Sequence, residues 1–86
     1  MYEIIISEKL SKKLIKLRKK NILQFNAIFK KAEEIQIDPQ RYKNLRYPLN
    51  NLKRVHIDSH FVLLYSVDEE TKTIILEDFI HHDFAY

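Results

Sequence analysis

The residues best suited to acid–base chemistry gather in the last third of this chain of 86 residues. All four histidines lie there: His56, His60, His81 and His82. Imidazole is the side chain whose unperturbed pKa lets it both donate and accept a proton near neutral pH. The alternative interpretation is structural, with two polar residues beside a turn and a polar pair at the end of a strand. The pattern of histidines alone leaves both interpretations open.

Cationic and aromatic side chains accompany the histidines: Arg46, Lys53, Arg54 and the terminal Tyr86. Imidazoles among cations suit cleavage of a phosphodiester. A base takes the proton of the attacking hydroxyl, an acid protonates the leaving oxygen, and cations hold the charge of the phosphorane. An aromatic ring can stack on a nucleic-acid base or contact a phosphate. We therefore expect a shared groove lined by His56, His82, Tyr86, Arg54, Arg46 and Lys53.

A metal site is a third interpretation of the same residues. His56, His60, Asp83 and one of His81 or His82 are ligand types that zinc or manganese accepts. Their spacing is not that of a known metal motif, so we expect neither a metal ion nor a cofactor. Glycine is absent from the sequence, which excludes the glycine-rich loops that bind nucleotide phosphates.

The distribution of charge favours a polyanionic partner. The net charge is +3, and residues 7–36 carry nine Lys or Arg against three Glu, whereas residues 61–86 carry six acidic residues and one Lys. A basic N-terminal half is typical of nucleic-acid-binding proteins. The alternative is that the lysines simply form the solvent-exposed faces of helices. There is no cysteine, and no apolar stretch approaches the ~20 residues that span a bilayer. We expect one cytoplasmic domain over residues 1–86, without a signal peptide or membrane contact.

The apolar periodicity predicts an α+β fold with the element order β-α-α-β-β-β. A β-branched run at 2–6 predicts the first strand, and leucines at helical spacing after Ser7 predict the first helix. Asn21 interrupts this helix and caps a second one, which ends at Asp38 before Pro39. Three later runs predict an antiparallel meander: 53–57, 61–67 and 73–80. A helical hairpin would then pack on one face of a small antiparallel sheet.

Strand alternation assigns two candidate residues to one face of the sheet. Val55 and Ile57 share a face, so Arg54 and His56 share the opposite one. The run at 61–67 is apolar on both faces, which predicts a central strand. An arginine and a histidine should therefore lie together on the face that is turned away from Val55.

The C-terminal third resembles the RelE/ParE toxin superfamily of type II toxin–antitoxin systems in two segments, LKRVHIDSHFVLLYSVD and the ending HHDFAY. It looks closest to the YafQ-like branch of RelE-type mRNA interferases, and the resemblance covers nearly the whole chain. It implies a RelE-like fold and ribosome-dependent cleavage of mRNA, in which the 2′-hydroxyl attacks the adjacent phosphate without a metal. It also implies a cognate antitoxin, with the toxin alone a monomer and a larger complex formed with the antitoxin.

The resemblance carries catalytic roles to individual positions. His82 matches the catalytic histidine four residues before the final aromatic, and Tyr86 matches that aromatic. His56 matches the histidine of the second strand, and His60 stands where the YafQ-like pattern has an acid. We therefore expect His82 as the principal acid or base, with His60 or His56 as its counterpart. Simple alternation places His81, not His82, on the face of the sheet that Phe79 occupies. A catalytic role for His82 therefore requires a bulge, a twist or a strand end near Ile80.

Two further positions depart from the YafQ-like pattern. Tyr47 stands where that pattern has a histidine, and Arg54 stands where it has an acid. We expect Arg54, Arg46 and Lys53 to bind phosphate, with Tyr47 as a further substrate contact. Two rival functions stay open: a ParE-like toxin that inhibits DNA gyrase without catalysis, and a degenerate domain that only binds its antitoxin.

Overall fold

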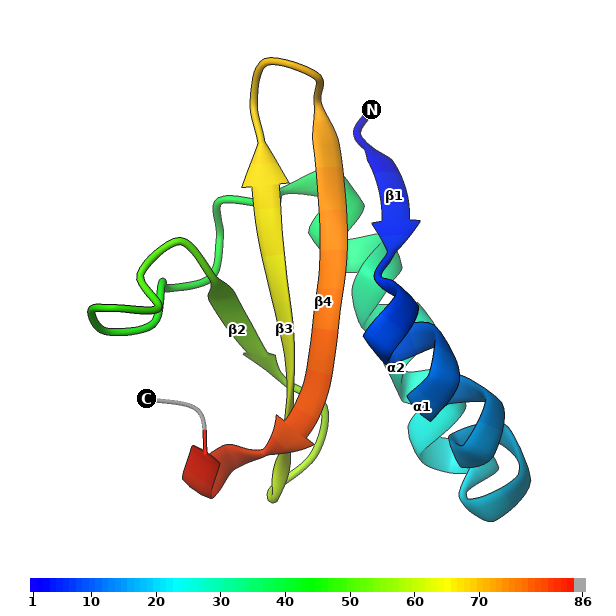
Figure 1. The fold of residues 1–86 in the computed structure, drawn as a ribbon. Coiled ribbons are helices and arrows are strands. Elements are labelled where there is room, and N and C mark those ends of the chain that lie inside the picture. The colour runs from blue at the N-terminus through cyan, green and yellow to red at the C-terminus, as the bar shows by residue number, and fades with distance from the viewer. Residues whose placement is uncertain (85–86) are drawn as a thin grey trace.

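Two helices pack against one face of a four-stranded sheet in the computed structural model, which describes residues 1–84 (Figure 1). The elements follow the predicted order: β1 (Glu3–Ile6), α1 (Glu8–Lys20), α2 (Ile22–Ile37), β2 (Lys53–His56), β3 (Phe61–Asp68), β4 (Thr73–His81) and a short 3₁₀ turn, η1 (His82–Phe84). The α+β class is therefore confirmed. Within residues 1–84, neither helix is long and apolar enough to cross a membrane.

The sheet has the strand order β1-β4-β3-β2, with β3 in an interior position as predicted. β3 pairs antiparallel with both β2 and β4, which confirms the meander. β1 instead pairs with β4 in parallel, so the sheet is mixed rather than wholly antiparallel. After the helical hairpin, β2 runs in the same direction as β1. The chain then reverses direction once before β3 and once before β4, so β4 again runs parallel to β1.

Side-chain caps start both helices. The Ser7 hydroxyl accepts a hydrogen bond from the amide of Leu10 at 3.0 Å, and the Asn21 side chain accepts one from the amide of Gln24 at 3.1 Å. Such caps satisfy amides that lack a partner within the helix. The helices then bury one face each against the sheet: Leu10 and Leu14 from α1, and Ile28, Ala32 and Ile35 from α2.

A second, smaller core lies on the face of the sheet that the helices leave open. Leu45 and Leu52, from the long connection between α2 and β2, cover Val62, Leu64 and Ile80. Figure 1 shows this connection and η1 on the side of the sheet opposite to the helices. The predicted alternation in β2 is confirmed, because Val55 is buried in the helix-side core while Arg54 and His56 are exposed.

A bulge in β4 changes the alternation before the C-terminal histidines. Leu76 pairs with Tyr65 and Asp78 pairs with Leu64, so Glu77 is the extra residue. Both Leu76 and Phe79 consequently belong to the helix-side core, although they are an odd number of residues apart. The strand ends at His81, and His82 begins η1. Of the irregularities predicted near Ile80, the strand end is therefore present, whereas the bulge lies before Phe79 and leaves the alternation from Phe79 to His81 unchanged.

An ion pair between α1 and the bulged part of β4 makes stability dependent on pH. Lys13 Nζ lies 2.6 Å from Asp78 Oδ1, Lys9 Nζ lies 3.1 Å from Oδ2, and the carboxylate side chain is only 12% exposed. Burial alone would raise the pKa of Asp78, but hydrogen bonds from Lys13, the amide of Phe79 and Lys9 outweigh it. The pKa of Asp78 therefore lies below the ordinary aspartate value of 3.8.

We expect Asp78→Asn to lower the free energy of unfolding at pH 7 by about 1–2 kcal/mol. Because the folded pKa is depressed, the stabilisation is complete above pH 3.8 and is lost as the pH falls through the folded value. Urea unfolding at pH 7 and at pH 3 should therefore show a smaller difference for Asp78→Asn than for the wild type. Glu33→Gln, which removes an exposed carboxylate from α2, is the matched control. An unchanged pH dependence in Asp78→Asn would contradict this origin.

Candidate functional site

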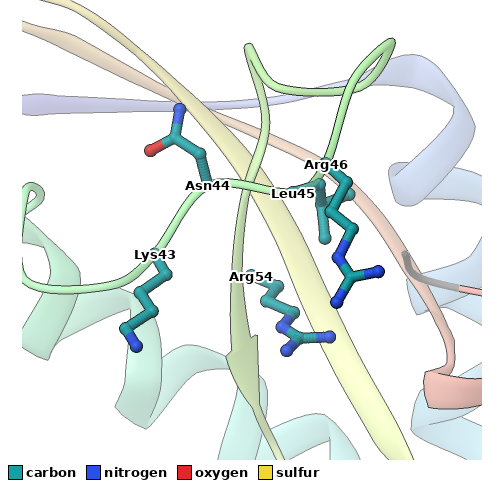
Figure 2. Close-up of a pocket in the computed structure, with 5 residues that line it drawn as sticks. All are labelled: Lys43, Asn44, Leu45, Arg46 and Arg54. Atoms are coloured by element: carbon teal, nitrogen blue, oxygen red, sulfur yellow. The ribbon is translucent and has the colours of Figure 1, made fainter.

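A basic groove follows β2 at the edge of the sheet. One part is an open cavity of about 440 Å³ lined by Lys43, Asn44, Leu45, Arg46 and Arg54 (Figure 2). A second cavity of about 330 Å³ shares Lys43 and Arg54 with the first and adds His56 and Lys31. In Figure 2 the side chains of Arg46, from the loop, and Arg54, from β2, extend in the same direction. The basic groove is defined here by five residues: Lys31, Lys43, Arg46, Arg54 and His56.

Backbone pairing holds the loop that carries Arg46. The amide of Leu45 donates to the carbonyl of Leu52 at 2.8 Å, and the amide of Arg54 donates to the carbonyl of Lys43 at 3.2 Å. Lys53 Nζ donates to the Asn44 side-chain oxygen at 2.7 Å and to the carbonyl of Tyr42 at 3.1 Å. Lys53, a predicted phosphate ligand, thus directs its ammonium at the loop. These contacts hold the loop that forms one wall of the groove.

A histidine cluster lies where β3 begins and β4 ends. One ring nitrogen from each of His60, His81 and His82 falls within 4.8 Å of the others. The rings stack, with centroids 4.7 Å apart for His81 and His82 and 6.0 Å apart for His60 and His81. Sequence reasoning singled out His60 and His82 for catalysis. It gave no catalytic role to His81, the last residue of β4, although the His81 ring stacks on the rings of both His60 and His82.

Backbone contacts join His60 and His82 directly. The amide of His82 donates to the carbonyl of His60 at 2.8 Å, and His82 Nδ1 lies 3.1 Å from the same oxygen. Because a carbonyl only accepts hydrogen bonds, this contact requires a proton on Nδ1. Asp83 Oδ1 lies 3.1 Å from that Nε2. The two contacts, one at each ring nitrogen, thus fix the direction of the His82 ring.

The turn before β3 is held by a carboxylate. Asp58 Oδ1 accepts hydrogen bonds from the amides of His60 at 2.8 Å and Phe61 at 2.9 Å, and Oδ2 accepts one from Gln24. Desolvation raises the pKa of Asp58, but these hydrogen bonds outweigh it and leave the pKa below its usual value. An ionised Asp58 at neutral pH therefore keeps the turn closed and fixes the backbone of His60.

The strand register relates the groove to the cluster. His56, in the groove, pairs with Val62 on β3, and Val62 pairs with Ile80 on β4. His60 and His82 are each two residues further toward the same end of these strands. The histidine cluster is therefore close to the end of the basic groove, while His56 belongs to the groove. Tyr47 is 88% exposed on the loop, and Tyr86 lies outside the described residues.

Two groove residues were not predicted from the sequence. Lys31 comes from α2 and reaches the groove only because the helix passes beside β2. Lys43 lies in the connection that precedes Arg46, and its position in a basic segment was the one local signal for it. The fold and the site together define a small basic α+β protein with clustered imidazoles, suited to a polyanionic partner.

Comparison with known proteins shows the family. The family model described as the ParE toxin of type II toxin–antitoxin systems, parDE, matches residues 4–86. This chain belongs to that family of toxins. A protein of Methanocaldococcus jannaschii that carries the provisional name toxin RelE4 is 56% identical over 86 residues, which are 100% of this chain and 92% of the relative.

Solved structures share the fold at low sequence identity. A YoeB/ParE toxin from Agrobacterium tumefaciens has a TM-score of 0.83 at 8% identity, over 93% of this chain and 98% of that chain. The RelBE2 toxin–antitoxin complex of Mycobacterium tuberculosis gives 0.77 at 23% identity, over 93% and 90%. YafQ of Escherichia coli gives 0.69 at 18% identity, over 96% of both chains. The predicted RelE-like fold is confirmed.

Proposed function

We propose that this toxin is a ribosome-dependent endoribonuclease that cleaves mRNA without a metal ion. The observation that carries the proposal is that the basic groove along β2 ends close to the histidine cluster, which lies where β3 begins and β4 ends. The groove supplies cations for a phosphate, and the cluster supplies groups that donate and accept protons. Both sets of groups occur within a fold shared with the RelE-type toxin of the RelBE2 complex.

The reaction proceeds by attack of the RNA 2′-hydroxyl on the adjacent phosphate. A base takes the hydroxyl proton as the bond from the 2′-oxygen to phosphorus forms. The bond from phosphorus to the 5′-oxygen then breaks, and an acid protonates that oxygen, which leaves a cyclic phosphate and a 5′-hydroxyl. His82 is the principal proton-transfer residue, because contacts with the His60 carbonyl and with Asp83 orient the two nitrogens of its ring. His60 or His56 supplies the second proton transfer.

Cations and aromatic rings position the RNA in this scheme. Arg46 and Arg54 line the same cavity and stabilise the charge of the phosphorane. Tyr47 projects from the same loop as Arg46 and can stack on a base. Tyr86 takes the role of the terminal aromatic that positions the substrate. The lysine-rich surface of α1 engages ribosomal RNA through charge, which makes binding dependent on salt.

A cognate antitoxin is the expected protein partner. The matching family is one of toxin–antitoxin systems, and a similar solved structure is a complex of toxin with antitoxin. An acidic segment of the antitoxin would cover the basic groove and exclude RNA from it.

Inhibition of DNA gyrase without catalysis is the second candidate function. The family description itself favours it, because the matching model is named for ParE toxins. One fold can serve both activities, so the arrangement of the site has to decide between them. The three clustered imidazoles favour the nuclease, since a toxin that only binds its target has no need of proton transfer.

Expression of the chain in cells separates the two functions. We expect growth arrest, rescue by the product of the adjacent gene, and primer-extension stops within the translated region of a reporter mRNA. The same mRNA without a ribosome-binding site is the control and should stay intact. Intact translated mRNA together with accumulated DNA damage would support the gyrase alternative and reject the nuclease.

A further inference from the structure

The histidine cluster holds a set of ligands suited to a transition metal. We propose that His60, His81 and His82 bind one divalent transition-metal ion, such as zinc, and that this ion inhibits the toxin by occupying His82. Imidazole ligands favour Zn²⁺, Ni²⁺ and Cu²⁺, whereas Mg²⁺ and Ca²⁺ favour oxygen ligands. The inhibitory part rests on the proposed nuclease function; the binding part does not.

The distances require only a small adjustment for binding. Zinc holds nitrogen ligands at 2.0–2.1 Å, so two nitrogens of a tetrahedral site lie about 3.3 Å apart. The three candidate nitrogens are already within 4.8 Å of one another. The rings of His60 and His81 are nearly parallel, at 7°, so they must turn for their lone pairs to meet at one ion. Partial exposure leaves space for this turn, since the His81 and His82 side chains are 35% and 40% exposed.

The backbone under the cluster is already fixed. His60 follows the turn closed by Asp58, and the amide of His82 donates to the carbonyl of His60 at 2.8 Å. His82 Nδ1 lies 3.1 Å from the same carbonyl oxygen. A metal-binding histidine commonly donates its second ring N–H to a carbonyl, which orients the ring and leaves the other nitrogen for the metal. His82 Nδ1 has this arrangement, and a metal at Nε2 would take the place of the contact with Asp83.

Asp83 provides a carboxylate beside two of the imidazoles. Its Oδ1 lies 3.1 Å from His82 Nε2, and its Oδ2 lies 3.4 Å from His81 Nδ1. These separations are close to those between neighbouring ligands of one ion. The negative charge also offsets that of the bound cation, so Asp83 strengthens binding as a ligand or as a hydrogen-bond partner of a ligand.

Calorimetric titration of the purified toxin with zinc chloride tests the binding. We expect one zinc ion per chain and no heat from magnesium. His81→Phe keeps an aromatic ring against Phe61 and Phe84 but removes both nitrogens, and it should weaken zinc binding by about 100-fold. Asp83→Asn should weaken it by about 10-fold. His56→Phe, outside the cluster, is the matched control and should bind like the wild type. Circular dichroism verifies that each variant is folded.

The inhibitory part is tested by mRNA cleavage in a translation reaction with and without equimolar zinc. Zinc should inhibit the wild type, and removal of the zinc with a zinc-selective chelator should restore cleavage. Wild-type toxin that binds no zinc, or a folded His81→Phe with unchanged affinity, would overturn the metal site. Zinc binding with undiminished cleavage would overturn the inhibition alone. A toxin that binds zinc but never cleaves would reject the nuclease function and leave the metal site standing.

Discussion

A His82→Ala toxin is expected to lose at least about 100-fold of the mRNA cleavage rate, since proton transfer by a positioned side chain contributes ~10²–10⁴-fold. Growth arrest on expression should disappear with it. The fold should persist, because His82 lies in η1 with its side chain 40% exposed and outside both apolar cores. Cleavage of a ribosome-bound message by purified toxin, measured with circular dichroism of the same sample, separates loss of chemistry from loss of structure.

The matched control for this experiment is another histidine of the same cluster. His81→Phe removes the imidazole that stacks on His82, with ring centroids 4.7 Å apart, but keeps His82 itself. We expect this variant to lose less cleavage than His82→Ala. A folded His82→Ala protein that still arrests growth would contradict the catalytic role of His82. His60 and His56 would then be the remaining candidates for proton transfer.

The secondary structure follows from local signals that the sequence contains. Ser7 and Asn21 are polar caps at the starts of apolar helical patterns, and both accept the hydrogen bonds expected of them. The parallel pairing of β1 with β4 was not predicted. It depends on contacts between residues about 70 positions apart, such as Glu3 with Thr73, and no local pattern specifies them.

The site was predictable where strand alternation holds. Arg54 and His56 lie on the open face because Val55 is buried, which is a property of adjacent residues. The histidine cluster could not be derived in this way. The bulge at Glu77 shifts the alternation of β4, and the cluster then depends on the strand ending at His81. Histidine spacing along the chain indicated no metal motif, because these histidines come from a turn and a strand end.

Lys53 shows a further limit of reading charge from sequence. A basic residue beside Arg54 is a reasonable phosphate ligand by type. The structure gives its ammonium two oxygen acceptors, Asn44 Oδ1 and the carbonyl of Tyr42. Which of two neighbouring cations faces a substrate depends on the path of the 38–52 connection, and that path is set by the burial of Leu45 and Leu52 against the sheet.

The double variant Arg46→Ala/Arg54→Ala is expected to lower the mRNA cleavage rate by about 100-fold, because each removed donor to a developing oxyanion costs ~10²–10³ where water is excluded. The open groove admits water, which reduces the loss for each arginine below this range, to about 10-fold. Each single variant should lose less than the double variant. Arg54→Lys should recover only part of the rate, since lysine keeps the charge but not the bidentate geometry.

Arg18→Ala is the control that separates specific phosphate contact from overall charge. Arg18 lies in the last turn of α1, which packs against the opposite face of the sheet, so its removal changes net charge without changing the groove. If the arginines acted only through general attraction to ribosomal RNA, Arg18→Ala would lose about as much cleavage as Arg46→Ala or Arg54→Ala. High salt would then reduce cleavage by all three variants to the same degree. Contact with the scissile phosphate predicts instead that the groove variants stay slow at every salt concentration, even when saturating ribosomes compensate for weaker binding. Equal losses in Arg18→Ala and Arg54→Ala would therefore contradict a catalytic role for the groove.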